Sequence, residues 1–431
     1  VHLLDLDSGN SSLLAGGDDD ARSSILPVGF VASGEGFWLV TNQAGEFQQL
    51  AWQSLDAGAK PQIVTAEIPW NVDEGALSHD RTRLAFVVNE NGMSRLYLLD
   101  TNSRRYRAVS EVPTGIAYGL AFSPDDRQLA LTLNTPQTPS DSFVLELGNR
   151  PLEHGDLVRW TTSEVGGLDT EAFATPELVH YPTFDEVDGD ARQIPAWVYR
   201  PRSESPVPVI ISIHGGPEGQ ARPYFNSTFQ MWVETLGVAV IAPNVRGSNG
   251  YGKSYLALDN GFKREDSVRD IGSLLDWIAA QPDLDESRVA VYGGSYGGYM
   301  VLASSVHYSD RLRAAVDVVG ISNFVTFLEN TEDYRRDLRR AEYGDEREPR
   351  MRAHLEKISP LNNVGEIGIP MFIVQGENDP RVPVTESEQV VRALREQGQP
   401  VWYMNALNEG HGYQRKENRD IYQQAMVMFL Q

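Results

Sequence analysis

The sequence lacks cysteine, long apolar runs and an excess of basic residues. Without cysteine among its 431 residues it can form no disulfide, no catalytic thiolate and no cysteine-ligated metal site. No apolar run approaches the roughly 18–20 residues of a membrane-spanning helix. Lysine and arginine number 37 against 60 aspartates and glutamates, which gives a formal net charge of -23. Nucleic acids and anionic membranes bind basic surfaces, so we expect neither as a partner.

Signals for metals, cofactors and export are also missing. There is no H-E-x-x-H, no histidine cluster, no calcium loop and no G-x-x-x-x-G-K phosphate loop, so we expect no metal and no cofactor. The first residue is Val1, and no basic-then-apolar leader follows it. The compartment stays open between the cytoplasm and a periplasmic or secreted location. A hydrophobic content of 41% and a charged content of 23% describe an ordinary soluble globular protein.

The first third of the chain carries an internal repeat. Three similar segments align on Ser33, Ser78 and Ser123, which are 45 residues apart. Each has a polar turn and then a strand-like run that ends near an asparagine. A period in the forties with several short strands predicts β-propeller blades, and a tandem β-sandwich is the alternative. About three blades are visible where closed propellers have four to eight, so we expect residues 1–175 to be part of a propeller and a junction, with further blades before them.

From residue 176 the pattern changes to strands that alternate with helices. The expected strands are Val209–Ile213, Val238–Ala242, Val289–Tyr292, Ala314–Val319, Met371–Gln375 and Val401–Met404. The expected helices include 267–280, 386–397 and 420–430. Thr385 followed by Glu388 predicts a capping box at the start of the second of these. Alternating units of this kind predict an α/β fold, with a doubly wound and mainly parallel sheet over 176–431.

A serine between a strand and a helix is the first candidate for chemistry. The stretch V-A-V-Y-G-G-S-Y-G-G-Y (289–299) places Ser295 two residues from Gly293 and two residues from Gly297. This is the G-x-S-x-G nucleophile elbow, in which serine sits on a sharp turn and the glycines let neighbouring backbone pass closely. A glycine-rich turn that merely contains serine is the plain alternative. We predict that Ser295 is a nucleophile.

A serine nucleophile needs a base that is held by a third group. Asp379 lies in the loop after a strong strand, and His411 lies between glycines after the last strand. The chain order Ser, Asp, His is that of α/β-hydrolases. Glu377 is a nearby competitor for the acid role. We predict a triad of Ser295, Asp379 and His411.

An oxyanion hole needs backbone N–H groups that point at the tetrahedral oxygen. Tyr296, directly after the nucleophile, is expected to supply one of them. The loop after an early strand reads I-H-G-G-P and is expected to supply the other from Gly216. For His214 in that loop we favour a role in shaping the loop over a catalytic one.

Taken together, these motifs resemble the prolyl oligopeptidase family of serine peptidases, especially bacterial members like acylaminoacyl peptidases and dipeptidyl peptidases. The matching motifs are H-G-G-P (214–217), N-V-R-G-S-N-G-Y-G (244–252), G-G-S-Y-G-G (293–298), Y-G-D (343–345), I-S-P-L (358–361), N-D-P-R-V-P (378–383) and E-G-H-G (409–412). They span almost all of 176–431. The resemblance implies a propeller ahead of an α/β-hydrolase domain.

The resemblance also implies roles for individual residues. The family's nucleophile, acid and base fall on Ser295, Asp379 and His411, and its oxyanion donors fall on Tyr296 and Gly216. An apolar substrate pocket would lie near Tyr296 and would be lined by Tyr299, Val319, Phe324 and Phe327. Oligopeptides would be the substrates, with the propeller restricting access by large folded proteins. Family members are often oligomeric, so a homo-oligomer is one of the assembly states that the resemblance allows.

Three functions are compatible with these motifs. The first is a serine peptidase that acts on short peptides through an acyl-enzyme. The second is an esterase or general acyl hydrolase, because the same groups serve esters. The third is a silent binding protein that presents its propeller as an interaction surface. A complete triad argues against the third, and the blades argue against the second. Residues 1–150 show no clear acidic pair for binding a free amino group, so exo- and endo-cleavage both stay open.

Overall fold

The computed structural model describes residues 1–16, 23–56 and 58–431. The chain divides into two compact units. The first unit comprises Val1–Phe173 with the short segments Arg222–Asn226 and Gly250–Ser254, and the second comprises Ala174–Ala221, Ser227–Asn249 and Tyr255–Gln431. In the described part of the chain, no helix is both long enough and apolar enough to span a membrane.

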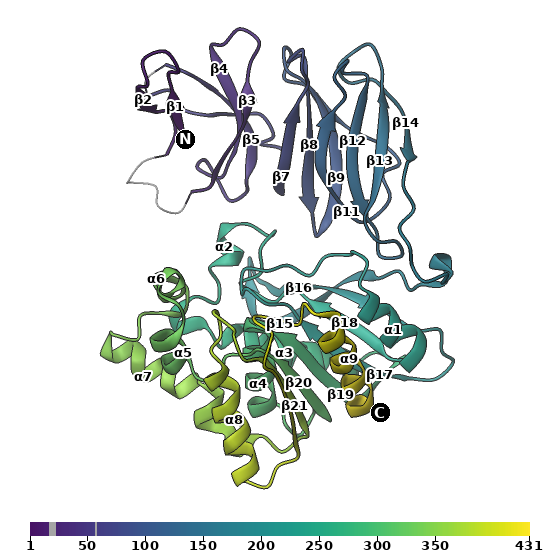
Figure 1. Cartoon of the computed structure of the whole chain (residues 1–431), viewed down its shortest axis with the longest axis vertical. Helices are drawn as coiled ribbons and strands as arrows, with labels where there is room; N and C mark the ends of the chain where they lie inside the picture. Colours follow the sequence, from purple (N-terminus) through teal and green to yellow (C-terminus); the bar gives the residue numbers. More distant parts are fainter. Residues whose placement is uncertain (17–22, 57) are drawn as a thin grey trace. The chain divides into compact units, whose positions relative to one another are not determined.

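The first unit is built from antiparallel sheets that follow one another along the chain. Three of them have four strands, in the orders β3-β4-β5-β6, β10-β9-β8-β7 and β11-β12-β13-β14, and a two-stranded sheet β1-β2 precedes them (Figure 1). The strands are β1 (His2–Leu4), β2 (Ser11–Leu13), β3 (Ile25–Phe30), β4 (Gly36–Thr41), β5 (Gln49–Ser54), β6 (Gln62–Ile63), β7 (Asn71–Leu77), β8 (Arg83–Glu90), β9 (Met93–Asp100), β10 (Tyr106–Ala108), β11 (Ile116–Phe122), β12 (Gln128–Asn134), β13 (Asp141–Leu147) and β14 (His154–Arg159). Successive four-stranded sheets are propeller blades, as predicted.

The sequence repeat marks the same position in each blade. Ser78 and Ser123 precede β8 and β12. The hydroxyl of each serine accepts a hydrogen bond from the backbone N–H of the first residue of that strand, Arg83 or Gln128. Side chains on β8 alternate between two apolar clusters. Phe86 packs in the cluster shared with the preceding blade, and Val87 packs in the cluster shared with the following one. Because both faces of the strand are buried, β8 reads as a nearly continuous apolar run.

The second unit contains one eight-stranded sheet with the order β15-β16-β18-β17-β19-β20-β21-β22. Its strands are β15 (Glu177–Val187), β16 (Asp190–Tyr199), β17 (Val207–Ile213), β18 (Ala239–Pro243), β19 (Leu284–Gly294), β20 (Ala314–Val318), β21 (Met371–Gly376) and β22 (Val401–Ala406). The strands from β18 to β22 in the sheet order are parallel, and β15 and β16 are antiparallel. The six predicted strands are all present, and the hairpin β15–β16 at the edge was not predicted.

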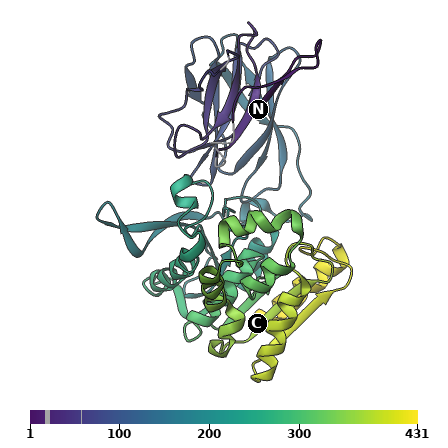
Figure 2. The ribbon, with the colours of Figure 1, turned by 90° about the vertical axis from the view of Figure 1, so that its left-hand side faces the viewer.

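Helices cover both faces of this sheet (Figures 1 and 2). The helices are α1 (Ser227–Leu236), α2 (Lys253–Leu256), α3 (Asp266–Ala279), α4 (Tyr296–His307), α5 (Phe324–Asn330), α6 (Asp333–Tyr343), α7 (Pro349–Ile358), α8 (Val384–Glu396) and α9 (Lys416–Leu430), with 3-10 turns η2 (Thr170–Ala172), η3 (Gly261–Lys263) and η4 (Pro360–Glu366). Trp232 of α1 packs on Tyr292, and Tyr422 of α9 packs on Phe372. Helices α3, α4 and α8 pack against the sheet through the large apolar core of this unit.

Two details of the predicted helices are wrong. Helix α8 begins at Val384 with Pro383 as its N-cap residue, so Thr385 lies inside the first turn and makes no capping box. In the same turn, the carboxylate of Glu386 accepts the backbone N–H groups of Ser322 and Asn323 in a neighbouring loop. Helix α9 begins at Lys416, four residues before the predicted start.

Candidate active site

Ser295 lies at the turn where β19 ends and α4 begins. Its backbone angles are φ 59° and ψ -120°, a conformation that strains any residue with a side chain. A Cβ atom on Gly293 would lie 2.5 Å from the carbonyl oxygen of Gly297, so the backbone passes there too closely for a side chain. This is the backbone geometry expected of a nucleophile elbow, and it holds the serine at the carboxyl edge of the sheet.

Asp379 and His411 lie in the loops after β21 and β22 and are hydrogen-bonded to each other. Nδ1 of His411 is 2.7 Å from Oδ2 of Asp379. The other oxygen, Oδ1, accepts the backbone N–H groups of Arg381 and Val382 at 2.8 and 3.1 Å. The Asp379 side chain is fully buried, and 15% of the His411 side chain is exposed. A carboxylate fixed in this way holds the proton on Nδ1 and leaves Nε2 able to accept another.

Glu377, the competing candidate for the acid, is engaged elsewhere. Its carboxylate accepts a hydrogen bond from the side-chain amide of Asn405. Among the described residues, the carboxylate that contacts the His411 ring is that of Asp379. The geometry therefore favours Asp379 over Glu377 as the group that orients the imidazole.

The loop after β17 brings its glycines beside Ser295. A Cβ atom on Gly215 would lie 3.4 Å from the Cβ of Ser295. Gly216 has φ 129°, a conformation that glycine alone adopts readily. Tyr296 is the first residue of α4, and the first N–H groups of a helix have no acceptor within that helix. The two expected oxyanion donors thus belong to segments that flank the serine.

His214 shapes this loop. Its Nδ1 lies 2.9 Å from the carbonyl oxygen of Gly215, and its Nε2 lies 2.8 Å from the hydroxyl of Ser248. Burial lowers the pKa of His214, so the ring is neutral, and Nδ1–H donates to the carbonyl. That carbonyl belongs to the same peptide group as the Gly216 N–H, and His214 therefore orients the expected donor without contacting the reacting atoms.

The predicted pocket residues are deeply buried, and three of them are packed together. The rings of Tyr299 and Phe324 lie 4.6 Å apart between centroids, and those of Tyr296 and Tyr299 lie 5.5 Å apart. Phe327 belongs to the same apolar cluster. Val319 follows β20 with φ 49° and donates its N–H to the Val374 carbonyl. None of Tyr299, Val319, Phe324 and Phe327 is more than 3% exposed.

Tyr343 is an aromatic residue of this cluster that the sequence did not single out. Its ring lies 5.1 Å from that of Phe324 and 6.0 Å from that of Phe327. The motif Y-G-D that it opens is the signal that could have identified it. Its neighbours Arg339 and Glu342 on α6 are buried charged residues, which no sequence pattern marked.

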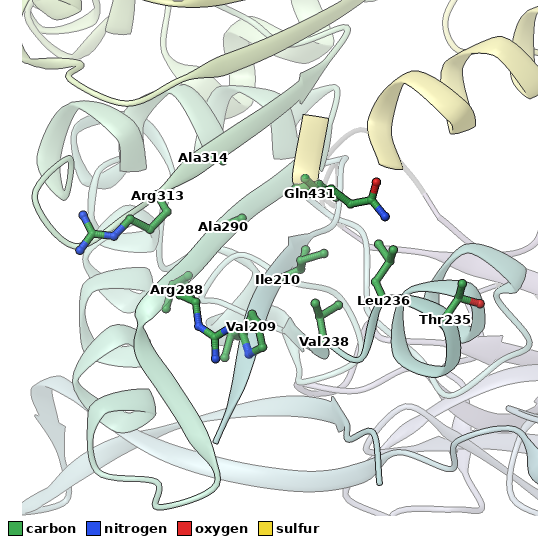
Figure 3. Close-up of a pocket in the computed structure, with 13 residues that line it drawn as sticks. Val209, Ile210, Thr235, Leu236, Val238, Arg288, Ala290, Arg313, Ala314 and Gln431 are labelled. Atoms are coloured by element: carbon green, nitrogen blue, oxygen red, sulfur yellow. The ribbon is translucent and has the colours of Figure 1, made fainter. Parts of the chain in front are cut away.

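A separate cavity of about 390 Å³ lies at the other end of the parallel strands (Figure 3). Apolar residues of β17 and β19 line it together with Arg288 and Arg313. The loops with Ser295, Asp379 and His411 follow the carboxyl ends of their strands, where ligands of such sheets bind, and this cavity lies at the amino ends. Within the described residues, no group of three or more histidine, aspartate or glutamate side chains is placed to hold a metal ion.

Comparison with known proteins agrees with this architecture. Residues 223–431 match the model of the prolyl oligopeptidase family. Dipeptidyl aminopeptidase BIII of Pseudoxanthomonas mexicana is 34% identical over 232 residues, which are 53% of this chain and 34% of the relative. Dipeptidyl peptidase family member 6 of Caenorhabditis elegans is 28% identical over 77% of this chain and 46% of its own length. The chain therefore spans between a third and a half of the length of these relatives.

Solved structures show the same fold. A puromycin-hydrolyzing peptidase of Mycobacterium tuberculosis superposes with a TM-score of 0.84 at 22% identity, over 98% of this chain and 63% of that one. The acylaminoacyl peptidase of Pyrococcus horikoshii superposes with a TM-score of 0.76 at 20% identity, over 94% of this chain and 62% of that one. Residues 223–431 thus match the prolyl oligopeptidase family model, and the chain shares its fold with these solved structures.

Proposed function

We propose that this protein is a serine peptidase that hydrolyses short peptides through an acyl-enzyme intermediate. The observation that carries the proposal is the 2.7 Å hydrogen bond between His411 and Asp379, on the same edge of the sheet as the strained Ser295 turn. Relatives named as dipeptidyl aminopeptidase and acylamino-acid-releasing enzyme support peptides as the substrate class.

The proposed reaction assigns one role to each residue. His411 Nε2 takes the proton of the Ser295 hydroxyl as the oxygen attacks the scissile carbonyl carbon, while Asp379 keeps the imidazolium oriented. The resulting oxyanion is bound by the N–H groups of Gly216 and Tyr296. His411 then gives the proton to the leaving amine as the C–N bond breaks. Water, activated by the same imidazole, hydrolyses the ester and restores the serine.

Two finer features belong to the same proposal. The apolar side chains of Tyr299, Val319, Phe324 and Phe327 would form one wall of the pocket for the substrate residue before the cleaved bond. The propeller blades would limit substrates to short peptides, as the family resemblance implies. If so, a peptide of a few residues is cleaved while the same sequence inside a folded protein is not.

A panel of chromogenic substrates tests the function, with Ser295→Ala as the blank. The panel contains a free-amino dipeptidyl p-nitroanilide, an N-acetyl-aminoacyl p-nitroanilide, a blocked Gly-Pro p-nitroanilide and a p-nitrophenyl ester. We expect cleavage of at least one anilide and labelling of Ser295 by a fluorophosphonate, both lost in the variant. Turnover of the ester alone would indicate an esterase. A folded protein with neither turnover nor labelling would indicate a binding protein.

A further inference from the structure

A buried arginine on α6 reaches the loop that carries the proposed oxyanion donor. Nη1 of Arg339 donates to the carbonyl oxygen of Gly216 at 3.0 Å and to the carboxylate of Glu342 at 2.7 Å. Only 10% of the Arg339 side chain is exposed. Because φ of Gly216 is 129° and glycine has wide backbone freedom, a charged donor on its carbonyl restrains a segment that would otherwise move.

A second buried arginine reaches the side chain of the other proposed donor. Nη1 of Arg264 lies 3.2 Å from the phenolic oxygen of Tyr296 and is paired with Asp259. Nη2 of the same arginine donates to the backbone carbonyl of Glu342 at 3.1 Å. The Arg264 side chain is fully buried. The side chain of Tyr296, the first residue of α4, is therefore held in place by the buried guanidinium group of Arg264.

Glu342 joins the two arms. Its carboxylate accepts from Arg339 and lies 3.7 Å from Arg264, and its carboxyl group shares a hydrogen bond with that of Glu218 in the loop of Gly216. Burial raises the pKa of Glu342 to about 8. Burial alone would raise the pKa of Glu218. The hydrogen bond to Glu342 and the charge of Arg339 outweigh it, so the pKa of Glu218 is lowered. The pair therefore holds one proton at neutral pH.

We propose that Arg339 and Glu342 are positioning residues, which hold the N–H groups of Gly216 and Tyr296 at a fixed separation for the oxyanion. This inference rests on the proposed function, because it explains how the geometry of the same oxyanion hole is maintained. Breaking a buried ionic network leaves a charge without its partner, and the segments attached to it move. An oxyanion hole depends on donors placed to within a fraction of an ångström, so the loss falls on the transition state.

The test compares Arg339→Met with Arg340→Met, its neighbour on the same helix. Arg340 is also ion-paired, to Glu346, and does not belong to the network. For Arg339→Met we expect kcat to fall roughly 10- to 100-fold with KM changed less than about threefold. Affinity for a peptide aldehyde, which forms a tetrahedral adduct with the serine, should fall in parallel. Arg340→Met should retain both values.

A pH profile adds a readout that a purely structural role would not move. In the wild type, ionisation of Glu342 near pH 8 puts a second negative charge beside Glu218, facing Arg339 and Arg264. Two facing carboxylates repel each other, and Glu218 lies in the loop of Gly216, so the donor should shift and kcat should decline above that pH. Glu342→Gln keeps the shape of the side chain and removes the ionisation, so the decline should disappear.

The outcomes separate this inference from the function on which it rests. If the wild type cleaves an anilide but Arg339→Met behaves like Arg340→Met, the positioning role is overturned and the function stands. If Arg339→Met fails to fold, Glu342→Gln decides, and an unchanged decline above pH 8 overturns the inference. If the wild type cleaves nothing and is not labelled at Ser295, the function fails, and the inference fails with it.

Discussion

The backbone carbonyl of Gly410 lies against Gly376, in the space that a Cβ atom on Gly376 would occupy. Gly376 ends the strand that leads to Asp379, and Gly410 precedes His411. This close approach of two loops brings the carboxylate and the imidazole within hydrogen-bonding distance.

Gly376→Ala should therefore reduce activity without touching either side chain. The added methyl group pushes the His411 loop away, and a shift of about 1 Å in a catalytic group can cost roughly 100-fold in rate. We expect kcat to fall at least tenfold on that scale. Gly365→Ala is the matched control, because the nearest atom to its Cβ is a flexible amide end at 3.9 Å. Equal kcat values for the two variants would refute the steric argument.

The contacts of Asp379 predict that it matters more than Glu377. Asp379→Asn should leave the fold intact and lower kcat by up to about 10⁴, because an amide stabilises the wrong imidazole tautomer. Glu377→Gln retains a group that can bond to Asn405 and should change kcat less than about threefold. Steady-state kinetics with the best anilide substrate would decide. A larger loss in Glu377→Gln would mean that Glu377 is the acid.

The sequence was sufficient for the fold, and it singled out the candidate triad, because both predictions depend on local patterns. Buried strands read as short apolar runs, and the serine, acid and base each follow such a run. The edge strand β15 was missed because it lacks this signal, although its partner β16 ends in the buried run I-P-A-W-V-Y. Residues from Glu177 to Val187 are largely polar or only partly buried.

Arg339 and Glu342 could not have been predicted from their own helix. The sequence of α6 is D-Y-R-R-D-L-R-R-A-E-Y, which reads as a solvated surface helix. Their burial comes from packing against the loop of Gly216, more than a hundred residues earlier in the chain. The capping box at Thr385 failed because α8 begins at Val384 with Pro383 as its N-cap residue, so Thr385 does not occupy the cap position.

A buried carboxyl behind the nucleophile predicts how stability depends on pH. Asp317 on β20 is fully buried, and its carboxylate packs against Gly298 and Gly320. Burial raises the pKa of Asp317 from 3.8 to about 7. Between these values the unfolded chain has lost the proton and the folded chain keeps it, so the free energy of unfolding decreases as pH rises. The total loss is on the order of a few kcal/mol and is complete above the folded pKa.

Asp317→Asn should remove this dependence. Thermal unfolding of wild type and variant at about pH 5 and about pH 8 measures it, and the wild-type Tm should drop further between the two conditions. Glu342, whose pKa is raised to about 8, contributes a loss of the same sign. It is present in both proteins, so the difference between their slopes reports Asp317 alone. Parallel profiles would show that Asp317 is not the group responsible.

The strained backbone of Ser295 predicts a difference in stability between two inactive variants. Both Ser295→Ala and Ser295→Gly remove the nucleophile, so neither should turn over substrate or take up a fluorophosphonate. Only glycine relieves the conformation at φ 59° and ψ -120°, which costs about 1–3 kcal/mol for other residues. Glycine also gains about 0.5–1 kcal/mol of freedom in the unfolded chain, which offsets part of that relief. We expect Ser295→Gly to be the more stable by about 1 kcal/mol in urea unfolding, and a less stable Ser295→Gly would mean that the turn stores no strain.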